Sequence, residues 1–354
     1  MKIRTITVFT DSLYDGLDEI FHKAALLRKQ AEHIFSPLDI QTVRIALRQH
    51  FSHIARAGSI NQLGDKYNIP FISLGMYDKN THSERIIEII DKNKNLSLSY
   101  NCSTESDVKE CSEIISELAC KDSMNNFRFA GSINIEPFTP FFPAAYAGNG
   151  LSFALGFEWG DLLHKTFSEN TEMNYLEETL IRVFSSIERN CLVLENESGI
   201  QYRGMDMSLN PSVEETGSIA YSYDKVTGSF GSRLTLALTK GITDILGDIP
   251  VEKAGYCGVM FPVLEDRGLA HYWSKGNIDI DKLILYSSVC GCGLDMIPLP
   301  GNVSTEDIHR IILDLKAISD RYTKPLSARL LPVKGKDRGA ATAFESPYLV
   351  NTII

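Results

Sequence analysis

The feature of this sequence that most constrains its fold is the alternation of strand-like and helix-like segments through its first third. Four segments are continuously apolar or alternate β-branched with polar residues, as strands do: residues 3–11, 38–47, 67–78 and 96–102. Three segments space their apolar residues three and four apart, as amphipathic helices do: residues 13–35, 83–93 and 106–123. This alternation predicts an α/β fold with a mostly parallel, barrel-like sheet surrounded by helices.

The rest of the chain repeats these element types without a linker or an internal repeat. Further strands are expected at residues 256–266 and 326–333, and residues 201–216 are expected to form a strand that runs into a proline-containing turn. Further helices are expected at residues 175–198, 230–246, 278–290 and 305–322. Because no break in composition separates the parts, the sequence predicts a single α/β barrel-like domain over residues 1–354.

Residues 128–160 differ from their surroundings because prolines and glycines stand there among aromatic residues. Proline and glycine are typical of loops, yet the aromatic side chains carry more apolar surface than a loop leaves in water. We therefore expect this segment to line a pocket or to pack under a lid. Its apolar stretch FTPFFPAAY also makes a homodimer contact plausible.

The composition of the chain argues against two classes of partner, nucleic acids and membranes. The formal net charge of -10 and the pI near 5.4 argue against a nucleic-acid partner, whose usual binding surface is basic. No window approaches the roughly 18 to 20 apolar residues of a membrane span, so we expect no membrane association. The stretch MKIRTITVFTDS fits a first strand better than a secretion signal, which predicts a cytoplasmic protein.

Polar residues follow several strand-like runs, where α/β folds place their catalytic and binding groups. As catalytic candidates we take Asp206, Glu265 and Cys290. As substrate-binding candidates we take Ser208, Asp266, Asp295, Arg329 and Lys334. For any one carboxylate among them, a helix cap or a surface charge is an equally ordinary role, so the shared placement is what supports a site.

The stretch YSSVCGCGLDMIPLPG places Cys290 and Cys292 between glycines that let the backbone approach a ligand. Cys290 acts as a nucleophile only if its thiol is accessible and its pKa is lowered; the alternative is a buried cysteine at a corner of the chain. The pair lacks a second cysteine pair or a histidine cluster, which disfavours zinc. A hard cation at Asp206, Glu265 or Asp266 stays open, and the sequence names no cofactor.

Six phrases together resemble one family. They are TPFFPAAY, YRGMDMSLNPS, GYCGVMFPVLED, LILYSSVCGCGLDMIPLPG, KPLSARLLPVKGKD and FESPYLVNT. In this order they resemble the domain-of-unknown-function family 711. That resemblance implies a fold like pyruvate formate-lyase and the other glycyl radical enzymes, an α/β barrel with a finger-like central loop. It would place Cys290 near the tip of that loop, with Asp206, Glu265, Asp266 and Arg329 facing the same cavity.

Radical chemistry is not expected, because RLLPVKGKDRG does not reproduce the glycyl-radical phrase of those enzymes. The sequence instead favours an enzyme that acts on a small polar or anionic metabolite. Cys290 would then serve as nucleophile or acid/base, while Arg329 and Lys334 hold a carboxylate or phosphate. The alternative is a metabolite-binding or interaction protein that uses the same pocket without catalysis.

Overall fold

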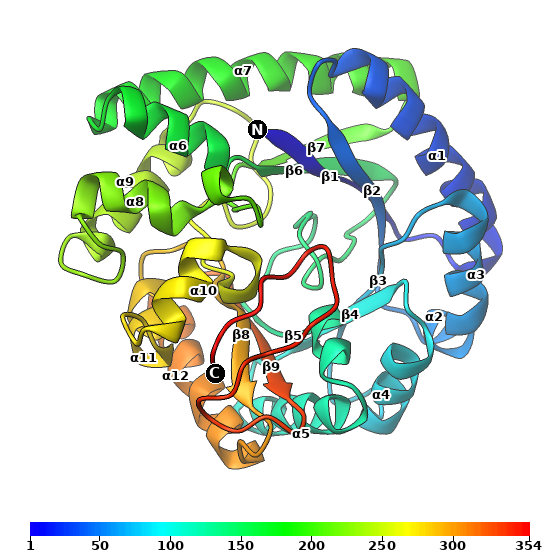
Figure 1. The fold of residues 1–354 in the computed structure, drawn as a ribbon. Coiled ribbons are helices and arrows are strands. Elements are labelled where there is room, and N and C mark those ends of the chain that lie inside the picture. The colour runs from blue at the N-terminus through cyan, green and yellow to red at the C-terminus, as the bar shows by residue number, and fades with distance from the viewer.

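A computed structural model describes all of residues 1–354 and shows one curved sheet of nine strands with helices around its outside (Figure 1). Across the sheet the order is β7-β6-β1-β2-β3-β4-β5-β9-β8. In chain order the strands are β1 (Lys2–Thr10), β2 (Ile40–Leu47), β3 (Ile72–Tyr77), β4 (Leu96–Asn101), β5 (Phe129–Ile133), β6 (Ser152–Glu158), β7 (Gln201–Asp206), β8 (Gly293–Pro300) and β9 (Leu326–Val333).

Most strand pairs are parallel, as the sequence predicted. Strands β1 to β5 form a parallel block, and β6 with β7 and β8 with β9 form two further parallel pairs. Only β1 with β6 and β5 with β9 pair antiparallel, so both ends of the sheet run against its centre. The α/β class is confirmed.

The sheet is not closed, and in this respect the predicted barrel is wrong. Strands β7 and β8 are its two edges. The chain between them makes only isolated bridges, Met205 with Lys253 and Leu209 with Val259, although residues 256–266 were expected to form a strand. Gly255 and Cys257 have positive φ angles of 74° and 45° there, so this segment cannot continue a regular ladder.

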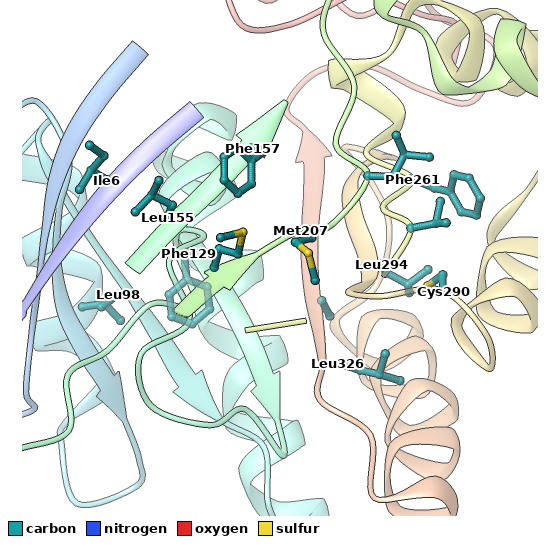
Figure 2. Packing of buried hydrophobic residues seen from close by; sticks show 14 of the residues in the cluster. Ile6, Leu98, Phe129, Leu155, Phe157, Met207, Phe261, Cys290, Leu294 and Leu326 are labelled. Carbon is teal, nitrogen blue, oxygen red and sulfur yellow. The ribbon is translucent and has the colours of Figure 1, made fainter. Parts of the chain in front are cut away.

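Helices cover the outer face of the sheet (Figure 1). They are α1 (Leu17–Ile34), α2 (Phe51–Ala55), α3 (Ala57–Tyr67), α4 (Ser83–Lys92), α5 (Glu105–Lys121), α6 (Gly160–Glu169), α7 (Met173–Ser198), α8 (Ile219–Thr227), α9 (Thr235–Asp248), α10 (Arg267–Ser274), α11 (Ile280–Ser287) and α12 (Thr305–Tyr322). A cluster of 77 buried apolar residues, part of which Figure 2 shows, packs these elements together. No helix combines the length and apolarity that crossing a bilayer requires.

The inner face of the sheet carries polar side chains that hold a central segment, residues 134–151. The Thr7 hydroxyl donates to the Pro140 carbonyl at 2.8 Å, and the Ser73 hydroxyl donates to the Ala145 carbonyl at 2.6 Å. In Figure 1 this blue-green segment lies inside the ring of strands. Strands β5 and β6 flank it, so the loop expected over residues 128–160 is shorter than the sequence suggested.

The end of the chain crosses the opening of this interior, where Figure 1 shows it in red. Two hydrogen bonds anchor it: the Val350 N–H donates to the Leu264 carbonyl at 2.7 Å, and the Thr352 side-chain hydroxyl donates to the Ala270 carbonyl at 2.6 Å. The ring of Tyr348 lies at 6.2 Å from that of Phe71, edge to face. The interior is therefore bounded by the sheet, the central segment and the end of the chain.

Candidate functional site

A cavity of about 350 Å³ lies between these three parts. Four arginines from three strands and one adjoining turn line it, together with two carboxylates: Arg4, Arg44, Arg128, Arg329, Glu265 and Asp295. Aromatic residues of the central segment, Phe141 and Phe142, line another part of the wall, as the aromatic composition of that segment predicted. The cavity thus combines an excess of positive charge with apolar surface.

Arg44 is the one arginine in the cavity wall whose terminal nitrogens have no acceptor in the protein. It projects inward from β2, is only 8% exposed, and its Nε donates to the Thr42 hydroxyl at 2.9 Å. Its guanidinium lies between the rings of Phe71 and Phe142, at 4.8 and 5.3 Å from their centroids. Burial and the nearby Arg4 lower the pKa of Arg44 to about 9. No carboxylate forms an ion pair with it.

Arg128 donates to the Asn93 and Leu96 carbonyls, whereas the charged side chains of the wall other than Arg44 and Arg128 form a connected network around Glu265. This carboxylate accepts from Arg4 Nη2 at 2.6 Å and from Arg329 Nη2 at 2.7 Å. Arg4 also donates to Glu158, and Arg329 Nε donates to Asp295 at 2.6 Å. Burial alone would raise the pKa of Glu265, but the Arg329 and Arg4 guanidiniums hold it below its ordinary value.

An irregularity in β1 brings Arg4 into this network. The pairing of β1 with β6 shifts register between Ile3 and Thr5, which is where a bulge can redirect a side chain from one face of a sheet to the other. Thr5 and Thr7 face the interior, with their hydroxyls 3.0 Å apart, yet Arg4, the direct neighbour of Thr5, also lines the cavity. The local break in pairing thus supplies a cation that strict alternation would not have placed.

Asn210 adds a neutral polar group to the cavity wall. It follows β7, is only 4% exposed, and its backbone carbonyl accepts from the Trp159 N–H at 3.2 Å. Its side-chain amide makes no hydrogen bond within the protein, although it retains access to the cavity. Since an amide both donates and accepts, this group is free to bond a ligand in either sense.

The opposite part of the wall is apolar. Phe141, Met260 and Cys292 form a small buried cluster against which Tyr256 packs. Burial raises the pKa of Tyr256, whose hydroxyl donates to the Ser327 hydroxyl at 3.1 Å. Burial and the nearby Asp295 raise the pKa of the Cys292 thiol, which keeps it protonated near neutral pH.

Three of the eight predicted site residues meet in the cavity: Glu265, Asp295 and Arg329. Asp295 is bonded through Oδ1 only, and its Oδ2 has no protein partner. Burial raises the pKa of Asp295, whereas Arg329 acts to lower it. Burial would lower the pKa of Arg329, but Asp295 and Glu265 raise it. The structure thus brings these three residues together, and their role in binding or catalysis stays a prediction.

Asp206 and Ser208 lie outside the cavity and bind backbone instead. The Asp206 carboxylate accepts from the backbone N–H groups of Tyr256 and Cys257, at 2.8 and 3.0 Å, and from both the N–H and the hydroxyl of Ser208. Burial raises its pKa despite these bonds. Gly255 is required beside it, because a Cβ there would stand 2.2 Å from Asp206 Oδ2. Asp206 therefore ties the irregular segment to β7.

Asp266 and Lys334 also have other partners. Asp266 is the N-cap of α10, accepting from the N–H groups of Gly268 and Leu269, and it also accepts from the Ser218 hydroxyl at 2.6 Å. Burial raises the pKa of Asp266. Lys334 donates its Nζ to the Cys120 carbonyl at 2.7 Å in an exposed position away from the cavity. The predicted anion clamp of Arg329 with Lys334 is therefore wrong.

Cys290 lies in the core between the sheet and the helices. It is 1% exposed, its N–H donates to the Tyr286 carbonyl at 2.7 Å, and it belongs to the same cluster as Phe261 and Leu294 (Figure 2). The loop that enters the interior is residues 134–151, so the placement of Cys290 at the tip of a central loop is wrong. Its neighbour Cys292 is the thiol that reaches the cavity.

Arg4, Arg44 and Asn210 were not singled out from the sequence, although Arg44 and Asn210 each left a faint signal. Arg44 interrupts the apolar run of QTVRIAL at a position that shares a face with Thr42. Asn210 follows the strand in the same phrase as Asp206. A charged residue on the inner face of a strand, rather than after the end of the strand, was the sequence signal that would have predicted the arginines of the cavity.

No group of three or more histidine, cysteine, aspartate or glutamate side chains is arranged to hold a metal ion. The carboxylates considered for a cation are each engaged by donors of the protein: Asp206 by three residues, Asp266 by a helix N-terminus, and Glu265 by two arginines. The site is therefore described by its arginines and amide rather than by metal ligands.

This fold and this cavity define an α/β protein with a buried, arginine-rich pocket on the inner face of a mostly parallel sheet. The chain belongs to the family described as Uncharacterised ACR (DUF711), which it matches over residues 1–345. The resemblance inferred from the six phrases is thereby confirmed at the level of the family.

Curated relatives of the chain are named UPF0210 proteins. A UPF0210 protein of Pyrobaculum aerophilum is 31% identical over 227 residues, which cover 60% of this chain and 50% of that protein. A UPF0210 protein of Pyrobaculum arsenaticum is 24% identical over 385 aligned positions, covering 96% of this chain and 85% of that protein. A UPF0210 protein of Lactobacillus delbrueckii is 27% identical over 252 residues, 67% of this chain and 56% of that protein. The chain thus matches about half the length of the first and third of these relatives.

Proposed function

We propose that this protein binds a small anionic metabolite in the cavity, with Arg44 as the principal anion-binding group. The observation that carries this proposal is the buried Arg44 guanidinium, whose terminal nitrogens lack an acceptor and which no carboxylate neutralises. A buried charge without a partner costs free energy, so proteins seldom keep one that serves no ligand. The planar fork of a guanidinium matches a carboxylate or a phosphate.

The charges around Arg44 support the same reading. Four arginines face the cavity, and its two carboxylates are already bound by Arg4 and Arg329. In an enclosed site of low dielectric this excess of positive charge favours an anion strongly. A volume of about 350 Å³ lies at the small end of ligand pockets, which supports a metabolite rather than nucleic acid or another polymer as partner.

Catalysis at the same cavity is the second candidate function. It is favoured by Asp295, whose raised pKa and unpartnered Oδ2 suit a general acid or base beside a bound anion. Cys292 is the thiol with access to that space, so it replaces Cys290 as the thiol to test. A non-catalytic metabolite sensor is the alternative, and turnover of a bound compound separates the two. Homodimer formation and a cytoplasmic location stay predictions.

The first experiment is titration calorimetry of the purified protein with inorganic phosphate and with a panel of small carboxylates. Arg44→Lys keeps the charge but removes the bidentate fork, and we expect it to weaken binding by at least about tenfold. The matched control is Arg310→Lys, which alters an exposed arginine paired with Glu306 on the surface of α12. Binding that is equal in all three proteins, or absent from the whole panel, would contradict the proposal.

A further inference from the structure

The cavity has a second free polar group, the amide of Asn210, and it restricts the ligand further than Arg44 does. Asn210 is only 4% exposed and lines the same cavity, and its side-chain amide has no hydrogen-bond partner in the protein. A buried amide left unpaired costs free energy, which a ligand group offering a hydrogen bond would recover. Arg44 and Asn210 are therefore two unsatisfied groups in the wall of one pocket.

The charge of the group that meets Asn210 is restricted by the arginines. A ligand ammonium group would share the cavity with four arginines, whereas the two carboxylates of the cavity are both paired with arginine and only Asp295 keeps a free oxygen, Oδ2. This like-charge contact in a low dielectric disfavours an amino acid. A neutral hydroxyl or carbonyl meets the amide without that repulsion.

The remaining wall restricts the rest of the ligand. Phe141, Met260 and Cys292 present apolar surface, and Phe71 and Phe142 flank the guanidinium that receives the anion. Apolar surface favours a hydrocarbon body, and it penalises a dianionic phosphate more than a monoanionic carboxylate, because the cost of removing charge from water rises with the charge. The pocket is thus matched to one anionic end, one neutral polar group and a short apolar body.

We infer that the ligand is a small hydroxy or oxo carboxylic acid with a short apolar chain. Arg44 receives its carboxylate, Asn210 bonds its hydroxyl or carbonyl, and the wall of Phe141 and Met260 covers its chain. This inference rests on the anion-binding function proposed above. Asn210 is then a specificity-determining residue, because its amide would bond the hydroxyl of a hydroxy acid and so favour it over the same acid without the hydroxyl.

The test compares three probes that differ at one position: 4-methylpentanoate, 2-hydroxy-4-methylpentanoate and 2-amino-4-methylpentanoate. Titration calorimetry with the unmodified protein is expected to show the hydroxy acid binding about tenfold tighter than the parent acid, the factor of one good hydrogen bond. The amino acid is expected to bind more weakly than both. In Asn210→Leu, which keeps a similar volume without the amide, the preference for the hydroxy acid should disappear while the parent acid keeps its affinity.

The outcomes separate this inference from the proposed function. Equal affinity for the hydroxy and parent acids, with both weakened by Arg44→Lys, would overturn the role of Asn210 and leave the anion site intact. Tightest binding of the amino acid, or no binding of any of the three probes, would also overturn the inferred ligand class. The proposed function fails only if the wider panel gives no binding that depends on Arg44.

Two further variants control for effects that do not come from the Asn210 amide. Asn174→Leu changes an exposed asparagine of α7 and is expected to leave all three affinities unchanged. If Asn210→Leu does not fold, the comparison of the three probes on the unmodified protein still decides the ligand class, and Asn210→Ala removes the amide with a smaller side chain at the same position. A preference for the hydroxy acid that survives in Asn210→Ala at full strength would count against the assignment.

Discussion

Two kinds of buried polar group sit next to each other in this protein, and they differ in where their hydrogen-bond partners come from. Asp206 and Asp266 are fully buried, yet backbone N–H groups and serine hydroxyls of the protein satisfy them. Arg44 and Asn210 are nearly as buried and keep free donors or acceptors toward the cavity. Burial and charge alone therefore do not identify a functional residue; the missing partner does.

Removing a satisfied group strands its partners, so folding stability should fall while ligand affinity is spared. Removing an unsatisfied group strands nothing, so stability should hold while affinity falls. Substitutions of satisfied and of unsatisfied buried groups should therefore differ in which of the two quantities they lower.

The largest effect is expected for Asp206→Ala. The backbone N–H groups of Tyr256 and Cys257 and the polar groups of Ser208 would lose their common acceptor inside the protein. We expect the free energy of unfolding to fall by about 3–5 kcal/mol, measured by urea denaturation. Asp314→Ala, at an exposed position of α12, is the control and should change it by less than about 0.5 kcal/mol. If Asp206→Ala lowered the free energy of unfolding by less than about 1 kcal/mol, the distinction between satisfied and unsatisfied buried groups would be wrong.

Glu265→Gln should have the next largest effect, and that effect should depend on pH. At pH 7 the variant leaves Arg4 and Arg329 without their shared anion, and we expect a loss of about 2–3 kcal/mol. The pKa of Glu265 is lowered in the folded protein, so its stabilisation is complete above the ordinary value of 4.5 and declines as the pH falls from there through the folded pKa. Urea midpoints of both proteins at several pH values should therefore converge on the acid side.

The matched control for this pH series is Glu178→Gln, an exposed position in α7. Its difference from the unmodified protein should be small at every pH. A Glu265→Gln deficit that stayed constant from pH 7 down to the acid limit would show that lost packing, rather than lost charge, causes it.

Hydrophobic periodicity predicted β1 to β4 and the helices α1, α4 and α5, because it reports which face of an element is buried. It did not predict β5 and β6, which lie within the loop expected over residues 128–160. It missed β8, where Pro298 and Pro300 suggested a break, although proline is tolerated in an edge strand. It also predicted a strand over residues 256–266, where the apolar run packs as irregular chain. Local pattern identifies burial, but the pairing that makes a strand is a long-range property.

The site was harder to predict than the fold, and the two cysteines show why. Cys290 and Cys292 are two residues apart, a spacing that puts side chains on one face of a regular strand. Gly291 packs directly on Gly258, and the turn there sends one thiol to the outer core and the other to the cavity. Arg329 and Lys334 are also separated, because β9 ends at Val333 and Lys334 beyond it binds the Cys120 carbonyl instead of reaching the cavity. Which face of a strand lines the cavity depends on how strands distant in the sequence pack together.

Cys290→Ala should have an intermediate effect on stability and none on binding. It removes a sulfur from the core beside Leu294, and we expect the free energy of unfolding to fall by about 1–2 kcal/mol. Affinity for the carboxylate identified in the first experiment should stay within twofold. Cys120→Ala, at an exposed position, is the stability control. A loss of affinity in Cys290→Ala with unchanged stability would restore Cys290 as a site residue.

The smallest effect on stability is expected for Arg44→Met, although its effect on binding should be among the largest. Methionine fills the space between Phe71 and Phe142 without a charge, so the cost of burying an unpaired guanidinium disappears together with its stacking on the two rings. Because these terms oppose each other, we expect the free energy of unfolding to change by less than about 1 kcal/mol in either direction. Urea denaturation without ligand measures this, with Arg310→Met as the surface control. A loss above about 2 kcal/mol would mean that Arg44 serves folding as Asp206 does, and the distinction between satisfied and unsatisfied groups would then no longer point to the ligand site.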